Sequence, residues 1–257
     1  MVWVPLVKAL RKRNRIMLWD YPGLLAGEQI SKDFSVSVPS LANYQIELLD
    51  AVSIDQACLV GWSLGPQVAI EIARNNQHRI SAIVALCGTA SSSFSDMHSE
   101  DPIGAVLGLS SSIPTAVHWL SERIDRIDRL RSFLKNLDHP TRWAKRFGFV
   151  DPIVDDILFD AVIKDFIALD PITYSRYLHA AAKHDASSIL PKLKIPTLVV
   201  AGERDNLISP SKMRTMANNL KGAEFFEVRG GTHFLPLEYP ALLALKIDDF
   251  LQRRISK

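Results

Sequence analysis

The chain has 257 residues, of which 47% are hydrophobic, and a formal net charge of +2 at pH 7. This size and composition allow one large core, so we expect a single α/β domain with an insertion rather than two independent domains. The balanced charge gives no support for a nucleic-acid partner, because such partners usually require a basic excess on one face. No apolar run is long enough to cross a bilayer and no signal-peptide pattern opens the chain, so we expect a soluble cytoplasmic protein without a membrane span.

The first predicted element is an amphipathic helix over residues 2–13, with cations gathered toward its end. Cations in that position interact favourably with the negative end of the helix dipole. A basic tract that binds lipid or directs nuclear import is the alternative interpretation of the same residues. A strand is then predicted over 15–20, closed by the turn Tyr21-Pro22-Gly23, and a second helix is predicted over 40–51.

The central feature of the chain is an apolar strand that turns sharply into a helix at Ser63. The turn matches the pattern G-x-S-x-G, as Gly61-Trp62-Ser63-Leu64-Gly65. A serine at so tight a turn requires a strained backbone and flanking positions that are nearly free of side chains, which Gly61 and Gly65 provide. Pro66 falls in the first helical turn, where a missing amide costs little. The pattern therefore predicts a nucleophilic serine.

A long insertion follows the next strand. Residues 80–86 are a nearly continuous apolar run, typical of a strand buried on both faces of a parallel sheet, whereas 90–188 contain no convincing strand. Within the insertion, 122–137 has apolar residues at helical spacing with charges between them. We interpret it as a solvated helix face, with a partner helix or an RNA contact as the alternative. The whole insertion predicts a helical cap over the strand ends, where open α/β sheets bind their ligands.

The sheet resumes after the insertion. Strands and helices alternate again over 195–202, 209–222, 223–228 and 239–253. Alternation on both sides of the insertion predicts an α/β fold with a doubly wound, mostly parallel sheet. We therefore expect residues 1–89 and 189–257 to form the core and 90–188 to form the cap.

The sequence carries no signal for a metal or a cofactor. Cys58 and Cys87 both fall within predicted strands, where we expect small buried side chains rather than a disulfide or metal ligands, in a reducing compartment. No two His or Cys residues have ligand spacing on one element. The stretch from Gly61 to Gly65 is too short for a phosphate-binding loop and lacks the Lys-Ser/Thr pair. We therefore expect no cofactor.

Two residues downstream of Ser63 complete a nucleophilic site. A serine hydroxyl needs a base, usually a histidine, and the histidine needs an acid that fixes its tautomer. Asp205 lies just beyond the strand over 195–202, and His233 lies in the loop after the next strand. The chain order Ser63, Asp205, His233 is the order expected of the α/β-hydrolase arrangement.

The acid has alternatives. Asp205 could be a turn or capping residue, in which case Asp170 or Asp185 would substitute for it. His184 stands beside Asp185 and suggests a dyad, but adjacent side chains rarely face each other. We therefore prefer a structural role for His184.

Three motifs together resemble the α/β-hydrolase superfamily. They are Gly61-Trp62-Ser63-Leu64-Gly65, the stretch 199–205 and the stretch 231–240. Within that superfamily the chain is similar to cap-bearing serine carboxylesterases of the pimeloyl-carrier-protein methyl esterase group. Members with an aspartate nucleophile are disfavoured, because position 63 is serine.

The N-terminus departs from the family pattern. Family members open with three strands, and a His-Gly loop after the third donates one backbone amide of the oxyanion hole. Here the first helix begins almost at Met1, so the resemblance implies an N-terminally truncated fold in which Leu64 supplies the one remaining donor. Loss of one donor typically lowers the rate on the order of 100 to 1000-fold. The strand over 15–20 would then have to pair directly with the strand before Ser63, or both would leave backbone groups unpaired.

Two explanations fit this departure. Either the true protein starts upstream of Met1 and carries the missing loop, or the chain is a truncated and inactive relative. The complete set of Ser63, Asp205 and His233 favours the first explanation.

The resemblance implies a serine hydrolase that cleaves a small-molecule carboxylic ester or acyl thioester. An acyltransferase, a carbon–carbon bond hydrolase and an inactive hydrolase-like protein are the alternatives. Aromatic residues of the cap suggest an apolar acyl pocket, although aromatic residues in such a segment more often form the core of the cap itself. The predicted substrate-binding residues are Trp62, Trp119, Trp143, Phe147 and Phe234. The acyl chain length and the oligomeric state are left open.

Overall fold

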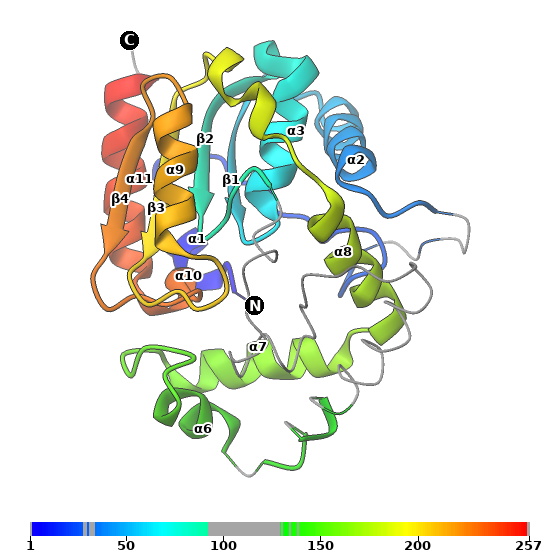
Figure 1. The fold of residues 1–257 in the computed structure, drawn as a ribbon, viewed down its shortest axis with the longest axis vertical. Helices are drawn as coiled ribbons and strands as arrows, with labels where there is room; N and C mark the ends of the chain where they lie inside the picture. The colour runs from blue at the N-terminus through cyan, green and yellow to red at the C-terminus, as the bar shows by residue number, and fades with distance from the viewer. Residues whose placement is uncertain are drawn as a thin grey trace.

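A parallel sheet forms the centre of the protein (Figure 1). The computed structural model describes residues 2–27, 30, 34–91, 129, 131–133, 135–137 and 139–255. Within them the sheet has four strands in the order β1-β2-β3-β4, and every neighbouring pair is parallel. The strands are β1 (Ala57–Trp62), β2 (Ile80–Leu86), β3 (Thr197–Gly202) and β4 (Glu224–Val228). The predicted strands over 80–86, 195–202 and 223–228 are thereby confirmed to within two residues.

Helices cover both faces of this sheet. One face carries α2 (Val38–Ala51), α3 (Gly65–Asn76) and α9 (Pro210–Asn219), and the other carries α1 (Val4–Leu10) and α11 (Pro240–Arg254). Short turns of helix connect the elements: η1 (Gln77–Arg79), η3 (Ser187–Lys192) and α10 (Leu235–Glu238). Successive β2 residues alternate between the two cores, so the strand is apolar on both sides as its sequence predicts.

The helix α2 begins where its sequence provides a complete cap. The Ser37 hydroxyl accepts a hydrogen bond from the Ser40 amide at 3.1 Å, and the Ser40 hydroxyl accepts one from the Ser37 amide at 3.0 Å. Pro39 lies in the first turn, where its missing amide leaves no bond unmade. The helix therefore starts two residues before the predicted position.

The N-terminal segment corrects two predictions. The first helix is shorter than the predicted 2–13 and packs Leu6 and Leu10 against α11. The predicted strand over 15–20 is wrong: these residues form no strand, and in the described chain β1 pairs with β2 alone. None of residues 15–20 is fully buried, so water can satisfy backbone groups that lack a strand partner.

The segment between β2 and β3 contains three described helices, drawn below and to the right of the sheet in Figure 1. They are α6 (Pro140–Arg146), α7 (Asp156–Ala168) and α8 (Pro171–Lys183). We call residues 90–188 the insertion. Its helices α6 and α7 have an apolar cluster of their own, which also takes in Leu237 and Phe234 from the region after β4. Of the predicted helix over 122–137, only a few residues are described, and the rest lies outside the described residues.

No helix in the described ranges is long and apolar enough to span a membrane.

Candidate active site

Ser63 occupies the turn between β1 and α3 in a strained backbone conformation. Its φ is +61°, in the left-handed region that residues with a side chain rarely adopt, and its amide donates to the Leu86 carbonyl at 3.0 Å. A Cβ at Gly61 would lie 2.4 Å from the Gly65 carbonyl carbon, so this glycine is required by close backbone contact. The same expectation for Gly65 is wrong, because a Cβ there would meet no atom within 4 Å.

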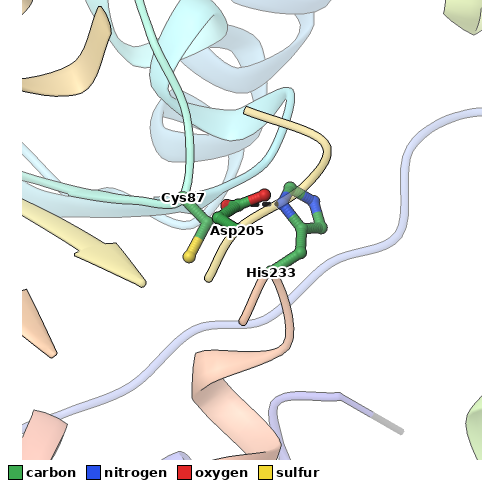
Figure 2. A group of neighbouring side chains, drawn as sticks. All are labelled: Cys87, Asp205 and His233. Atoms are coloured by element: carbon green, nitrogen blue, oxygen red, sulfur yellow. Dashed lines mark hydrogen bonds and ion pairs between the residues drawn. The ribbon is translucent and has the colours of Figure 1, made fainter. Parts of the chain in front are cut away.

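Three side chains form a continuous hydrogen-bonded chain. His233 Nε2 lies 3.0 Å from Ser63 Oγ, and His233 Nδ1 lies 2.9 Å from Asp205 Oδ2. Figure 2 shows the Asp205 carboxylate against the imidazole, with its hydrogen bond drawn as a dashed line. The sequence places these residues at the carboxyl ends of β1, β3 and β4, which meet at one edge of a parallel sheet.

Two backbone amides fix the orientation of the Asp205 carboxylate. Asp205 Oδ1 accepts hydrogen bonds from the Leu207 and Ile208 amides, both at 2.9 Å. The other carboxylate oxygen is left facing His233. Asp205 and His233 are each only 5% exposed, so their interaction is shielded from water. This arrangement can hold one imidazole tautomer and stabilise the imidazolium that forms when Nε2 accepts a proton.

The two alternative acids, Asp170 and Asp185, make hydrogen bonds elsewhere in the structure. Asp170 caps α8 by accepting from the Thr173 amide at 2.7 Å, and Asp185 accepts from the Ser187 amide at 2.7 Å. The hydrogen bonds from Ser187 lower the pKa of Asp185. His184 faces the Glu71 carboxylate at 3.0 Å. The geometry therefore favours Asp205 over both substitutes.

Leu64 stands at the N-terminus of α3, where its position suits an oxyanion donor. It is the residue that precedes the first helical residue, Gly65. The first amides of an α-helix have no partner within the helix, and the helix dipole adds positive potential there. A negatively charged oxygen next to Ser63 would be stabilised at this position.

Two of the predicted substrate-binding residues lie beside His233. The Trp62 indole donates to the His233 carbonyl at 2.6 Å, and its ring centroid lies 5.2 Å from the imidazole. Phe234 is 5.8 Å from Trp62 and meets Phe159 of α7 edge-on at 5.1 Å. Trp62 therefore holds the backbone of the histidine, and Phe234 joins the histidine loop to the insertion.

The other two described candidates lie in a separate aromatic cluster. Trp143 packs against Phe133, Phe147 and Phe149, with ring centroids 4.9 to 5.4 Å apart. Phe147 is 59% exposed. These ring contacts place Trp143 and Phe147 together within the insertion rather than at Ser63. Trp119 lies outside the described residues.

Cys87 was not predicted to belong to the site, yet its thiol lies beside it. Cys87 follows β2 with a φ of +46°, is fully buried, and has its Sγ 3.6 Å from the Thr232 carbonyl. Its sulfur and one atom each of Asp205 and His233 lie within 4.8 Å of one another, a set that could hold a metal ion (Figure 2). Burial, reinforced by the charge of Asp205, raises the pKa of the thiol well above its ordinary value. Because a metal requires the thiolate, these residues fit a metal poorly.

Glu238 is a second residue that sequence patterns alone do not assign. It lies at the end of α10, five residues after His233, and is 4% exposed. Its carboxylate accepts from the amides of Asp151 and Thr232, both at 2.8 Å, and from the Thr232 hydroxyl at 2.5 Å. Burial raises the pKa of this carboxyl. Its position in the stretch 231–240 is the only sequence signal that singles it out.

The fold is that of an α/β hydrolase. The chain belongs to the Alpha/beta hydrolase family, whose sequence profile matches residues 1–245. It is 25% identical over 268 residues to polyketide synthase ThaQ of Burkholderia thailandensis, covering 98% of this chain and 11% of that protein. It is 32% identical over 88 residues to the pimeloyl-[acyl-carrier protein] methyl ester esterase of Aeromonas hydrophila, covering 34% of this chain and 33% of the esterase.

Solved structures have the same fold. The enol-lactonase from Burkholderia xenovorans LB400 matches with a TM-score of 0.75 at 19% identity, covering 98% of this chain and 86% of the lactonase. The comparisons support an enzyme of the hydrolase class.

Proposed function

We propose that this chain is a serine hydrolase that cleaves a carboxylic ester or an acyl thioester. The observation that carries the proposal is the hydrogen-bonded chain from Ser63 Oγ through His233 to Asp205. Membership of a hydrolase family and the similarity to an acyl-carrier methyl ester esterase support the same reaction.

The roles follow from the geometry. Ser63 Oγ attacks the acyl carbon while His233 Nε2 accepts its proton, so a C–O bond forms and the carbonyl electrons move to the oxyanion. The Leu64 amide stabilises that oxyanion. Collapse of the tetrahedral intermediate expels the alcohol or thiol, which takes the proton from His233. Water then repeats the sequence and releases the acid, with no cofactor involved.

The insertion acts as a cap in this proposal. Its contact with the histidine loop, through Phe159 and Phe234, brings it beside the reacting groups. Among the aromatic residues that the structure describes, Trp62 and Phe234 lie beside His233 and are therefore the candidates for contact with an acyl group. Trp143 and Phe147 contact each other in a separate aromatic cluster of the insertion, and Phe147 is exposed, so the proposal assigns neither to the acyl group.

A burst assay tests the proposal. Wild-type protein is mixed with p-nitrophenyl butyrate and p-nitrophenyl octanoate, beside Ser63→Ala and the matched exposed control Ser211→Ala. We expect release of p-nitrophenol to fall by at least on the order of 10⁴-fold in Ser63→Ala and to stay unchanged in Ser211→Ala. Folded wild-type protein that releases no more product than Ser63→Ala would reject the hydrolase in favour of an inactive relative. An added alcohol that appears in the product as a new ester would identify acyl transfer instead.

A further inference from the structure

Glu238 is a buried carboxylate for which the reaction has no direct use. Nothing in the attack by Ser63 requires a second acid near Thr232, and a buried carboxylate is expensive to ionise unless several donors surround it. Its side chain lies under the loop that connects β4 to α10, with the three donors that surround it all belonging to Asp151 or Thr232.

The three hydrogen bonds join two parts of the chain that are far apart in sequence. Thr232 directly precedes His233, so two bonds to Thr232 fix the backbone from which the imidazole projects. Asp151 lies in the insertion, next to Val150 of the insertion's apolar cluster. Its carboxylate in turn pairs with Arg204, the neighbour of Asp205. One carboxylate thus contacts the histidine loop and the insertion at once.

We propose that Glu238 is a positioning residue for the hydrolase reaction, which holds His233 in line with Ser63 and ties the histidine loop to the insertion at Asp151. The inference rests on the proposed function, because it assigns Glu238 a role in that reaction. Glu238 does not touch the reacting atoms and acts through Thr232.

The arrangement of the donors around Glu238 allows its role to be tested by substitution with glutamine. Glu238 Oε1 accepts from the Asp151 amide and the Thr232 hydroxyl, whereas Oε2 accepts from the Thr232 amide. A carboxamide offers one oxygen and one NH₂ group. Whichever way it is turned, its NH₂ group faces one of the two backbone amides, and a buried donor loses its acceptor. Glu238→Gln therefore removes one interaction while keeping the size of the side chain.

The matched control is Glu203→Gln. Glu203 also accepts from an amide of the same loop, that of Gly230 at 2.7 Å, but it is exposed and water can replace it. Each variant is titrated with a fluorophosphonate to count reactive Ser63 sites, and kcat and KM for the p-nitrophenyl ester are calculated per reactive site. We expect kcat of Glu238→Gln to fall on the order of 10 to 100-fold, and kcat of Glu203→Gln to stay within about 2-fold of wild type.

Two further measurements separate positioning from simple structural support. The proton between His233 Nδ1 and Asp205 is followed by its low-field proton NMR signal, assigned by its loss in Asp205→Asn. We expect Glu238→Gln to shift or broaden that signal. Thr232→Ser, which keeps the hydroxyl donor, should restore most of the kcat that Thr232→Val loses.

The outcomes are distinct. A lower denaturation midpoint with kcat per site and the NMR signal unchanged would mean that Glu238 is merely structural and would overturn the inference. Wild-type protein that neither hydrolyses the ester nor reacts with the fluorophosphonate would instead reject the proposed function. In that case the NMR signal of wild type and Glu238→Gln still decides whether Glu238 positions His233.

Discussion

Two of the polar contacts between the insertion and the core are joints built around a glutamate, which is buried at Glu238 and partly buried at Glu71. The Glu238 joint consists of Glu238, Thr232 and Asp151. The Glu71 joint consists of Glu71 and Arg74 of α3 with His184, which follows α8. Burial raises the pKa of the Glu238 carboxyl. At Glu71 burial acts in the same direction, but hydrogen bonds from Arg74 and His184 outweigh it and lower the pKa.

The difference lies in the charge of the partners. The donors to Glu238 are amides and a hydroxyl, and the nearby carboxylate of Asp151 opposes its ionisation further. The donors to Glu71 include a guanidinium at 2.9 Å. Neutral donors satisfy a carboxylate geometrically without compensating fully for its lost hydration, whereas cationic donors do both. We therefore expect the Glu238 joint, next to His233, to affect mainly the geometry of the site, and the Glu71 joint, on α3, to affect mainly stability.

The largest expected effect comes from disturbing the Glu238 joint through its backbone. A Cβ at Gly202 would lie 2.3 Å from the Thr232 carbonyl oxygen and 2.7 Å from that of Gly231. Gly202→Ala must therefore push the histidine loop away from β3. We expect the free energy of unfolding to fall by about 1–3 kcal/mol and the rate to fall on the order of 100-fold, measured by urea denaturation and ester hydrolysis.

Gly65→Ala is the matched control for stability. A Cβ at Gly65 meets nothing within 4 Å, and the residue is in the first turn of α3. The substitution should leave stability unchanged or raise it by up to about 1 kcal/mol. If Gly202→Ala and Gly65→Ala lower the free energy of unfolding equally, close contact at Gly202 does not set the position of the histidine loop.

The Glu71 joint should show a smaller effect, and only on stability. The folded pKa of Glu71 lies below its ordinary value of 4.5, so its contribution is fully present above pH 4.5 and is lost as the pH falls through the folded pKa. We expect Glu71→Gln to lower the free energy of unfolding by about 1–2 kcal/mol at pH 7 and the difference from wild type to vanish in acid. The activity per folded molecule should not change. If the difference in the free energy of unfolding between wild type and Glu71→Gln is constant from pH 7 to pH 3, the charge of Glu71 does not contribute to stability.

The Glu238 joint should show the opposite pH dependence. Its folded pKa lies above the ordinary value of 4.5, so its contribution to stability is fully present below pH 4.5 and declines as the pH rises through the folded pKa. In denaturant titrations, the stability of wild type relative to Glu238→Gln should therefore decrease from pH 4 toward pH 7. If the stability difference from wild type depends on pH in the same way for Glu71→Gln and Glu238→Gln, the two joints do not differ in their electrostatics.

Local sequence patterns predicted most of the core and the central constellation. Continuous apolar runs identified β2 and β3, because strands buried on both faces need apolar residues at successive positions. The turn at Ser63 followed from its glycine pattern, and His233 and Asp205 followed from their places after strands. The roles of these residues and the cap remain predictions.

The predictions that were wrong or missing concern residues whose structure depends on tertiary contacts. Residues 15–20 have the composition of a strand, but a strand also requires a neighbour, which composition does not reveal. Gly65 looks as constrained as Gly61, yet only Gly61 meets passing backbone. Glu238 acquires its environment from Asp151, 87 positions away, which no local pattern contains.

The two ends of the insertion have a consequence for how this architecture can vary. Ser91 and Asp185 form an isolated antiparallel bridge, and the Ala186 amide donates to the Ala90 carbonyl at 3.0 Å. The chain therefore leaves the core and returns to it at hydrogen-bonded neighbours. Doubling the length of a flexible loop between such points costs only about 0.6 kcal/mol of closure entropy. Segments of very different length and shape can thus replace the one between Ser91 and Asp185 while the strands of the core stay the same.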